Sequence, residues 1–415
     1  MRILFVSTIL PIPTNNGRAM RSMSVLHGLW GVGHDLTFVS FAPRSRAANL
    51  EPLSRWCSQI DLLNMELPNL SEESNYFERI KSLLQAKSYT IQRFRSHAMR
   101  AKIQAHLSTG TVDLIVCDSL VSFVNVPKTS APIALNCHNV EHVILKRYAE
   151  IEPNFARRLY ARIEAALIRH AERDACRRAT IAMACSEVDR IMLRELRASL
   201  PVFVVPNAVD GDSVQTADNH NEQDRLLLFQ GGMDWYPNRD AVEFFAEQIL
   251  PLVRAEYPGV RFVIAGRTPS QDLVERLDGK NGISFTGTVP NMAPYVAAAT
   301  VVVAPLRLGS GTRIKILEAC AAAKPVVATS LGAEGLELDN GKQIILADDP
   351  AKFAASVIGL LRDSAQRDEI GRSARRAVME RYSQAVVELK LNFALSSIAH
   401  NKLKSMASGP IETGL

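Results

Sequence analysis

The sequence predicts an α/β protein made of two domains, each built on a parallel β-sheet. Its length of 415 residues exceeds what one ordinary hydrophobic core accommodates. The first forty residues alternate strand, helix and strand, which is how a parallel sheet begins. The same alternation starts again after a polar stretch near the middle of the chain. These features favour two domains over one large sheet, which is the alternative that the pattern leaves open.

The first half combines strand-like apolar runs with helical patterns. Apolar residues at helical spacing fill Arg18–Trp30, between strand-like runs at 3–7 and 36–41. Further strands are expected at Leu114–Cys117, Ile133–Asn136, Thr180–Ala184 and Val202–Val205. Basic helical stretches are expected over Arg79–Lys102 and Asn154–Arg178. The apolar stripe of the second stretch is expected to consist of Phe155, Leu159, Ile163, Ala166, Leu167 and His170.

The second half begins after the polar stretch Asp210–Arg225, which we interpret as the inter-domain linker. Strands are expected at Leu226–Phe229, Arg261–Ala265, Ile283–Thr286, Thr300–Ala304 and Pro325–Ala328. Helices are expected at Arg239–Arg254, Tyr295–Ala299 and Ile314–Ala323, with a plain connection over Glu275–Gly282.

Cysteine spacing, the apolar runs and the charge distribution limit which classes of protein the sequence can belong to. The six cysteines include no Cys-x-x-Cys pair, which argues against a zinc site or a disulfide framework and for a reducing compartment. Met1 leads straight into a strand, so we expect no signal peptide, and the longest apolar run, Tyr295–Leu306, is too short to span a bilayer. Residues 1–205 carry a net charge of +8 and the remainder −3. This basic half either contacts an anionic partner or carries ordinary solvated charge.

Two loops of the first half follow strands, where open α/β sheets place ligands. Gly17 comes just before a helix, so backbone N–H groups there can approach a phosphate; the alternative is a plain turn glycine. The loop from Cys137 to His142 brings imidazole, amide and carboxylate groups together after a strand. This loop makes His138 a candidate for catalysis or sugar binding, against the alternative of a structural histidine.

Two loops of the second half carry stronger signals. Gly231 and Gly232 open this half as Gly17 opens the first, either for close approach to a ligand or for a tight turn. The richest loop follows strand 300–304 and leads into a helix; its candidate residues are Gly309, Ser310, Gly311, Thr312, Arg313, Lys315 and Glu318. Backbone donors and two cations there suit a diphosphate, and Glu318 suits paired ribose hydroxyls. The alternative is a capped surface helix with a Lys–Glu pair.

At these loops the sequence resembles the retaining glycosyltransferases of family 4, which have the GT-B fold. The strongest stretch runs from Phe285 to Leu336, and includes Lys315-Ile-Leu-Glu318-Ala-Cys and Lys324-Pro-Val-Val-Ala-Thr-Ser-Leu-Gly-Ala-Glu-Gly335. Supporting pieces are Gly33-His34, Cys185-Ser186-Glu187, Val205-Pro-Asn-Ala-Val-Asp210 and Arg381-Tyr382-Ser383. The His138-Asn-Val-Glu141 loop and the Arg-rich helix after it are most similar to an exopolysaccharide-associated subgroup.

The resemblance implies two Rossmann-like domains that face each other across a cleft, with a C-terminal helix crossing back to the first. The expected domains are 1–208 with about 386–415 on the acceptor side, and 209–385 on the sugar-nucleotide side. Gly17 would contact the donor phosphate or sugar, and His138 the transferred sugar. Glu318 would hold the ribose hydroxyls, and the Val289 backbone would read the base.

Two departures from the family pattern stand out. The first acid of its Glu-x7-Glu motif falls on Ser310. The Arg and Lys usual after the first strand of the second domain are replaced by Gly232 and by Pro237 or Asn238. Arg313 and Lys315, with Arg267, are the cations that remain to supply positive charge. These departures bear on the identity and orientation of the sugar more than on the fold.

The sequence thus predicts a metal-independent transferase that moves a sugar from a nucleoside-diphosphate sugar to a glycan or lipid-linked acceptor with retention, without a cofactor. No Asp-x-Asp motif with apolar flanks is present to hold a metal. The alternatives are a GT-B 2-epimerase and a non-catalytic sugar-nucleotide-binding protein; a dehydrogenase is disfavoured, because no Gly-x-Gly-x-x-Gly follows either opening strand. We expect a cytoplasmic protein of cell-surface polysaccharide synthesis, with a peripheral contact to anionic membrane as one reading of its basic half, and no nucleic-acid partner.

Overall fold

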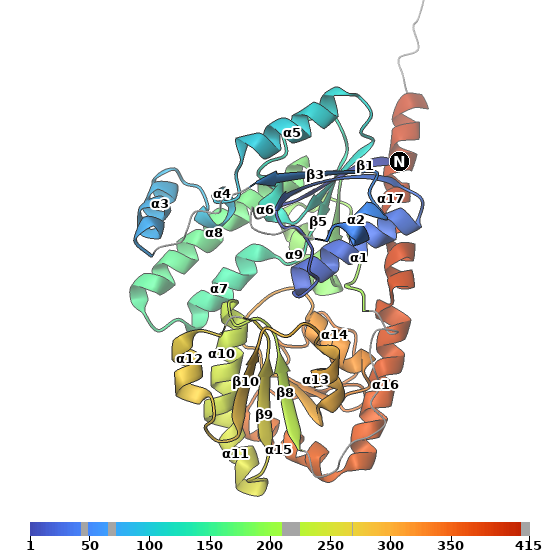
Figure 1. The fold of residues 1–415 in the computed structure, drawn as a ribbon. Helices are drawn as coiled ribbons and strands as arrows, with labels where there is room; N and C mark the ends of the chain where they lie inside the picture. The colour runs from blue at the N-terminus through green and yellow to red at the C-terminus, as the bar shows by residue number, and fades with distance from the viewer. Residues whose placement is uncertain (43–48, 65–71, 210–224, 268, 408–415) are drawn as a thin grey trace, which may run out of the picture. The chain divides into compact units, whose positions relative to one another are not determined.

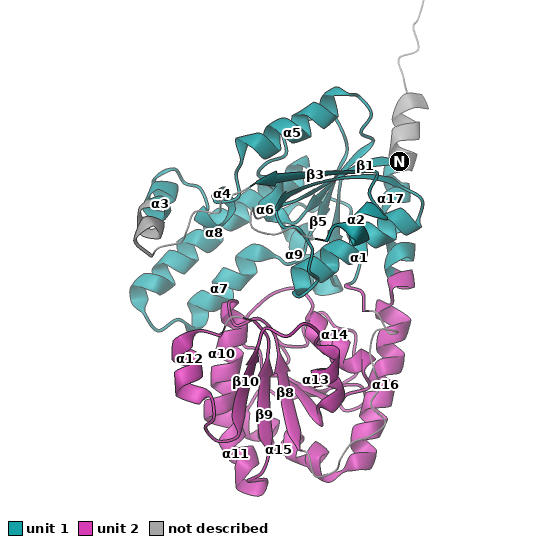
Figure 2. Cartoon of the chain, viewed as in Figure 1, with its two compact units in different colours: residues 1–206, 387–415 teal, residues 207–386 magenta. Residues whose placement is uncertain are grey.

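The computed structural model describes residues 1–42, 49–64, 72–209, 225–267 and 269–407. The chain divides into two compact units (Figure 2), unit 1 with Met1–Pro206 and Val387–Leu415, and unit 2 with Asn207–Val386. The boundaries expected from the sequence lie within two residues of these divisions. The expected linker, Asp210–Arg225, lies outside the described residues except for Arg225 itself.

Unit 1 contains a seven-stranded parallel sheet in the order β3-β2-β1-β4-β5-β6-β7 (Figure 1). Its strands are β1 (Arg2–Ser7), β2 (Asp35–Ala42), β3 (Gln59–Asn64), β4 (Leu114–Asp118), β5 (Ile133–Asn136), β6 (Ile181–Ala184) and β7 (Val202–Val204). Strand β3 was not expected, because its residues are only half-buried and lie at the sheet edge. Strand order changes direction between β1 and β4, the position at which open parallel sheets bind ligands.

Nine helices precede β7 among the described residues of unit 1. They are α1 (Gly17–Gly31), α2 (Glu51–Ser54), α3 (Glu72–Leu84), α4 (Tyr89–Gln92), α5 (His97–Ser108), α6 (Leu120–Phe123), α7 (Glu141–Ile151), α8 (Phe155–Arg178) and α9 (Glu187–Leu196). Buried residues of α4 to α9 share one hydrophobic core with alternate residues of the strands. The expected helical stretch Arg79–Lys102 is in fact three helices, because Ser88 and Ser96 cap new helix starts within it.

Helix α8 begins where the sequence predicts, since the side chain of Asn154 caps it by accepting from the Arg157 N–H. Its expected apolar stripe was wrong: Phe155, Leu159 and Ile163 are 69%, 47% and 41% exposed. The buried face instead consists of Ala161, Glu164, Ala165, Ile168, Glu172, Ala175 and Cys176. The buried face includes two acids, Glu164 and Glu172, because the N-termini of other helices supply hydrogen bonds to their carboxylates. The spacing of residues along α8 alone does not reveal these partners.

Each of those acids meets the start of another helix. Glu164 Oε1 accepts hydrogen bonds from Ser88 Oγ (2.7 Å) and Thr90 N (2.9 Å), at the beginning of α4. Glu172 Oε1 accepts from Glu141 N (2.7 Å), at the beginning of α7. Helix N-termini carry partial positive charge and unpaired N–H groups, so they stabilise a buried carboxylate.

Unit 2 contains a six-stranded parallel sheet in the order β10-β9-β8-β11-β12-β13. Its strands are β8 (Leu226–Gln230), β9 (Arg261–Ala265), β10 (Ile283–Gly287), β11 (Val301–Ala304), β12 (Val326–Ala328) and β13 (Ile345–Leu346). Successive residues of β8 face opposite sides: Leu227 and Phe229 pack into one core, Leu226 and Leu228 into the other. Both faces are therefore covered, as expected for a parallel sheet.

The helices of unit 2 divide between these two cores. One core takes residues from α10 (Tyr236–Phe244), a π-helical turn η1 (Phe245–Ile249), α11 (Leu250–Glu256), α12 (Gln271–Leu277) and α15 (Pro350–Arg362). The other takes residues from α13 (Ala293–Ala298), α14 (Ile314–Ala321) and α16 (Ser364–Tyr382). The expected helix Arg239–Arg254 is thus interrupted by the π turn. The connection expected over Glu275–Gly282 was wrong in part, because α12 extends to Leu277 and buries Leu273 against the core.

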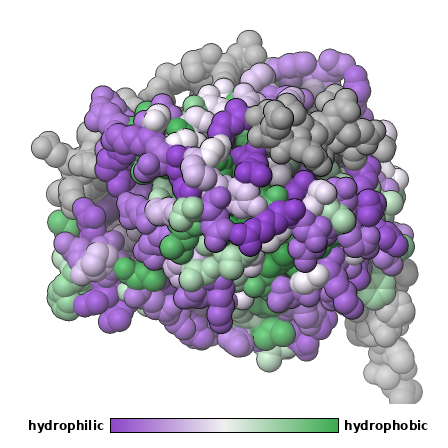
Figure 3. All heavy atoms as spheres, turned by 90° about the horizontal axis from the view of Figure 1, so that it is seen from below, coloured by the Kyte–Doolittle hydropathy of each residue, from purple (hydrophilic) through white to green (hydrophobic). Residues whose placement is uncertain are grey.

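The last helix, α17 (Gln384–Ala407), starts in unit 2, and its residues from Val387 belong to unit 1. On the face shown in Figure 3, hydrophobic residues form small patches among hydrophilic ones. None of the described helices is both long enough and apolar enough to cross a membrane. All six cysteines are buried and free.

Candidate active site

In unit 2, a polar cluster forms where β8 ends beside helix α14. Gln230, the last residue of β8, donates from Nε2 to the Lys315 carbonyl oxygen (2.9 Å) and to Glu318 Oε2 (3.0 Å). Lys315 Nζ donates to Asn238 Oδ1 (2.6 Å) and lies 4.2 Å from the centroid of the Phe229 ring. The structure therefore brings together the predicted Lys315 and Glu318. It adds Gln230, which the sequence did not single out, and Asn238, which the sequence had noted only as a replacement for a usual cation.

Burial perturbs both charged groups of this cluster. Burial and, to a smaller extent, the charge of neighbouring Arg313 lower the pKa of Lys315 to about 7, against the opposing effect of Glu318. Burial raises the pKa of Glu318 to about 7, against Lys315 and the Gln230 hydrogen bond. Charged groups that are held partly desolvated in this way gain their full charge when an oppositely charged or hydrogen-bonding ligand arrives.

Gly231 makes room for the Lys315 ammonium. Its φ of +151° is uncommon for residues with a side chain, and a Cβ there would lie 2.8 Å from Lys315 Nζ. The same Cβ would lie 2.7 Å from Asn238 Nδ2. At Gly232, a Cβ would collide with the Asp234 carboxylate. A side chain at either glycine would therefore displace the polar groups that pack against this loop, and at Gly231 it would also strain the backbone.

The loop before α14 is held by Arg313, the N-cap residue of that helix. Its Nη1 donates to the carbonyl oxygens of Ser310 (2.7 Å) and Gly311. A Cβ at Gly309, whose φ is +126°, would lie 2.6 Å from Arg313 Nη2. Thr312 Oγ1 accepts from Asn207 Nδ2 (2.7 Å). Arg313 is buried, and its observed contacts support the loop.

The remaining predicted residues of unit 2 lie around this edge of the sheet. Arg267, after β9, pairs with Asp234 in the loop after β8, with an Nη2–Oδ2 distance of 3.0 Å. Val289 follows β10 and is half-buried. The side chain of Ser310, which replaces a motif acid, is buried in the loop.

In unit 1, Asp118 is the centre of a buried network at the end of β4. Its Oδ1 accepts from His138 Nε2 (2.6 Å) and Asn136 Nδ2 (2.8 Å). Its Oδ2 accepts from Ser22 Oγ (2.6 Å) and Ser7 Oγ (3.0 Å). Four donors from β1, α1, β5 and the loop after β5 thus converge on one carboxylate.

The protonation of this pair follows from its surroundings. Burial alone would raise the pKa of Asp118, but attraction to His138 and the hydrogen bonds from His138, Ser22 and Asn136 lower it to about 2. For His138, burial lowers the pKa more than Asp118 raises it, and Arg21 and Arg18 lower it as well. Because a carboxylate only accepts, Nε2 of His138 carries the hydrogen, so in the neutral ring Nδ1 holds the lone pair.

Helix α1 supplies further groups to this edge. Gly17 is its first residue, capped by the Asn16 side chain, which accepts from Ala19 N (3.0 Å). Arg18 donates from Nη2 to Ser119 Oγ (3.1 Å), and Ser119 has a φ of +81°, a strained value that gathers at functional sites. Arg21 is buried and donates from Nε to Asn136 Oδ1 (3.1 Å).

Asp118 and Arg21 were missed from the sequence. Asp118 directly follows the predicted strand Leu114–Cys117, so the rule that ligands bind at strand carboxyl ends could have found it. Arg21 lies in a helix among apolar residues, and nothing in its spacing distinguishes it from an exposed basic residue. Among the described residues, no three His, Cys, Asp or Glu side chains are grouped so that they could hold a metal ion.

Comparison with known proteins agrees with this geometry. Residues 224–363, most of unit 2, match the family described as group 1 glycosyl transferases. The chain is 24% identical over 401 residues to an uncharacterized 44.6 kDa protein in the cps region of Klebsiella pneumoniae, which covers 93% of this chain and 97% of that protein. It is 30% identical over 214 residues to the phosphatidyl-myo-inositol mannosyltransferase of Mycolicibacterium smegmatis, about half of each chain (49% and 54%).

The solved structures add evidence on the fold. The crystal structure of Anabaena HepE in complex with UDP-glucose superposes with a TM-score of 0.65 at 16% identity, over 96% of this chain and 100% of that one. At this identity the likeness concerns the fold alone. The family match in unit 2, the homologous mannosyltransferase and the two parallel sheets together identify the chain as a glycosyltransferase of the GT-B type, with a group 1 glycosyl transferase domain in its second unit.

Proposed function

We propose that this glycosyltransferase moves a sugar from a nucleoside-diphosphate sugar to a hydroxyl of a glycan or lipid-linked acceptor, with retention and without a metal ion. The observation that carries the proposal is the cluster of Lys315, Glu318 and Gln230 beside the glycine loop at the end of β8. It combines a cation, a carboxylate and backbone donors in the space of a few residues. The UDP-glucose bound to HepE and the sugar transferred by the mannosyltransferase relative support the same substrate class.

The donor nucleotide is assigned to unit 2. A diphosphate would accept hydrogen bonds from the Lys315 ammonium and from the N–H groups of the Gly309–Thr312 loop. Its negative charge would raise the pKa of Lys315 from about 7, so that the ammonium stays charged. Ribose hydroxyls would donate to Glu318, and these bonds favour its ionised form. Arg313 is proposed as the residue that positions the loop, since its guanidinium donates to loop carbonyls.

In the proposed reaction, the bond between the anomeric carbon and the diphosphate oxygen breaks. A bond from that carbon to the acceptor oxygen forms on the same face of the sugar. The acceptor proton passes to the leaving phosphate, as the resemblance to retaining enzymes of this fold implies. The leaving group gains negative charge as the bond breaks, so preorganised donors and Lys315 lower the barrier. His138, held in one tautomer by Asp118, is assigned to the transferred sugar.

A screen of sugar nucleotides for released nucleoside diphosphate, with and without candidate acceptors, tests this proposal. A preferred donor should release its diphosphate catalytically, and NMR of the product should show the donor's anomeric configuration. Conversion of the donor to an epimer without acceptor would instead indicate a 2-epimerase. Binding of sugar nucleotides with no turnover at all would indicate a non-catalytic protein.

We place this activity in cell-surface polysaccharide synthesis at an anionic membrane surface. The relative in a cps region supports the first part. For the second, α8 exposes Phe155, Leu159 and Ile163, with Arg158 over the Phe155 ring at 5.7 Å. Apolar and basic side chains on one exposed helix suit the interface of an anionic bilayer.

Co-sedimentation with vesicles of anionic and neutral lipid, at low and high salt, tests this location. Capture on anionic vesicles should weaken with salt, because salt screens charge. A Phe155→Ser/Leu159→Ser variant should bind several-fold less. Absence from both kinds of vesicle would refute membrane contact and leave a soluble acceptor.

A further inference from the structure

Gln230, at the end of β8, is more deeply buried than the charged groups of the polar cluster in unit 2. Only 2% of Gln230 is exposed, whereas Glu318 is half-buried. Gln230 Nε2 donates to Glu318 Oε2 (3.0 Å) and to the Lys315 carbonyl oxygen (2.9 Å). Both partners are acceptors, so they determine which end of the carboxamide carries the NH₂ group. One side chain of the sheet therefore contacts both the backbone and the carboxylate of α14.

The Glu318 carboxylate is held in place by this amide. Among the residues that the structure describes, Gln230 Nε2 is the one group that donates a hydrogen bond to Glu318. The nearby Lys315 ammonium donates to Asn238 Oδ1 instead (2.6 Å), so the Lys–Glu pair that the sequence allowed is not what holds the carboxylate. A single hydrogen bond to Oε2 leaves Oε1 and the remaining lone pairs of the carboxylate for a ligand.

The other end of the amide indicates that Gln230 does more than fill space. Gln230 Oε1 is buried and accepts no hydrogen bond from any described residue. A buried acceptor without a partner costs free energy of folding, and a methionine of similar size would avoid that cost. Local conflicts of this kind gather at functional sites. What the amide supplies in return is its pair of donations to α14.

We propose that Gln230 is a positioning residue, which orients the Glu318 carboxylate toward the two ribose hydroxyls of the donor and so makes the site select ribonucleotides over deoxyribonucleotides. A carboxylate accepts best from two adjacent hydroxyls when its plane is fixed, and the donation from Gln230 fixes it. The same donation favours the ionised carboxylate, because it opposes the rise that burial causes in the pKa of Glu318. The inference rests on the proposed function, from which it takes the assignment of ribose to Glu318.

Calorimetric titration with UDP and GDP, each beside its 2′-deoxy form, tests the inference in the intact chain. The unaltered protein should bind the preferred ribonucleotide at least about tenfold more tightly than its deoxy form, because the deoxy form lacks one charge-assisted hydrogen bond. Gln230→Met keeps the size of the side chain but removes both donations. It should reduce the ratio of the two affinities to about twofold or less, mainly by weakening the ribonucleotide.

Two further variants separate positioning from a structural role. In a Glu318→Ala background the ratio should be close to one with or without Gln230→Met, since both changes act through one carboxylate. Gln271→Met is the matched control: it removes another Gln–Glu hydrogen bond of unit 2, from Gln271 Nε2 to Glu275 Oε1 (2.7 Å), on the exposed side of α12. This control should leave the ratio unchanged.

The outcomes distinguish a failure of this inference from a failure of the proposed function. An unchanged ratio in Gln230→Met, or an equal loss of affinity for both forms, would overturn the role of Gln230 and leave the ribose assignment standing. Equal binding of both forms by the unaltered protein would contradict the assignment of ribose to Glu318, and this inference with it. Circular dichroism and thermal unfolding check that each variant is folded, and Gln230→Leu replaces Gln230→Met in every comparison if the methionine variant is not.

Discussion

Replacing Asp118 by Asn tests whether the buried network of unit 1 depends on a charged carboxylate. The substitution keeps the shape of the side chain but turns one acceptor oxygen into a donor that faces other donors. Asp118 accepts from His138 and Ser22 at 2.6 Å each, from Asn136 at 2.8 Å and from Ser7 at 3.0 Å. At least one of these donors must lose its acceptor.

The expected loss of stability follows from the pKa of Asp118, which is lowered from 3.8 to about 2. At 1.36 kcal/mol per pKa unit, the folded protein favours the carboxylate over the carboxylic acid by about 2 kcal/mol. This contribution is complete above the unfolded pKa and is lost as pH falls through about 2, so it is fully present at pH 7. With the unsatisfied donor added, we expect the free energy of unfolding of unit 1 to fall by about 2–4 kcal/mol.

Urea unfolding at pH 7 measures this change. Trp30 and Trp56 lie in unit 1, so tryptophan fluorescence in a Trp235→Phe background reports on that unit. Asp113→Asn is the matched control: it removes a partly exposed acid that pairs with Arg2 at 3.6 Å, and should cost about 1 kcal/mol or less. A loss no greater for Asp118→Asn than for this control would refute the argument.

Four further outcomes test the proposed site. Glu318→Ala should weaken binding of the preferred nucleoside diphosphate by roughly 2–4 kcal/mol in calorimetry, since two charge-assisted hydrogen bonds are lost, and an unchanged affinity would reject its role. His138→Ala should leave that affinity intact but reduce turnover by about 10²-fold or more; normal turnover would make it a structural residue. EDTA should leave turnover largely intact, whereas a loss restored by added metal would contradict the proposed phosphate site. Affinity for the diphosphate should fall as pH rises above about 7, because free Lys315 then loses its charge, and a flat profile between pH 6 and 9 would argue against Lys315 as a ligand.

Periodicity in the sequence was enough to predict most of the sheets. Buried strands such as Leu114–Asp118 and Val301–Ala304 are short apolar runs, and in a parallel sheet both faces are covered, so the run itself is the signal. Two of the four edge strands were not predicted: β3 is only half-buried, and β13 has only two residues. The loop before α14 was also predictable, because its glycines require positive φ and its cations are close in sequence.

What the sequence did not predict depends on partners far along the chain. Gln230 is one polar residue at the end of an apolar strand, and only the fold shows that it connects Lys315 with Glu318, 85 and 88 residues away. Arg313 was expected to bind phosphate because of its place in the loop, and the structure adds that its Nη1 donates to two loop carbonyl oxygens. A single sequence gives the position of a charged group along an element, but not which acceptors the rest of the fold brings to it.

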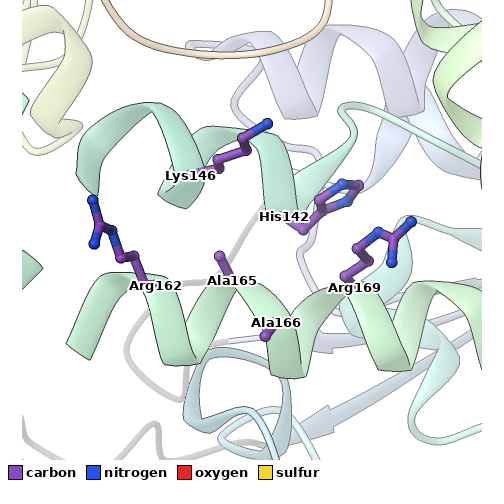
Figure 4. A pocket seen from close by; sticks show the side chains of 6 residues that line it. All are labelled: His142, Lys146, Arg162, Ala165, Ala166 and Arg169. Carbon is purple, nitrogen blue, oxygen red and sulfur yellow. The ribbon is translucent and has the colours of Figure 1, made fainter. Parts of the chain in front are cut away.

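In helix α8, the sequence alone did not show which side of the helix is buried, and this difference affects the proposed function. Its apolar residues form two rows, and the row of larger side chains was expected to be buried. The row of small residues is buried instead, because Glu164 and Glu172 on that side bond to the first turns of α4 and α7. These contacts place the larger apolar side chains and the arginines of α8 on the outside of unit 1. Basic residues that look like ordinary solvated charge in the sequence thus lie on this outer side, among them the two arginines of α8 labelled in Figure 4, and the apolar residues next to them become candidates for membrane contact. Two buried acids, which have no part in the chemistry proposed for His138 and Asp118, therefore determine which face of α8 is available for the proposed contact with an anionic membrane.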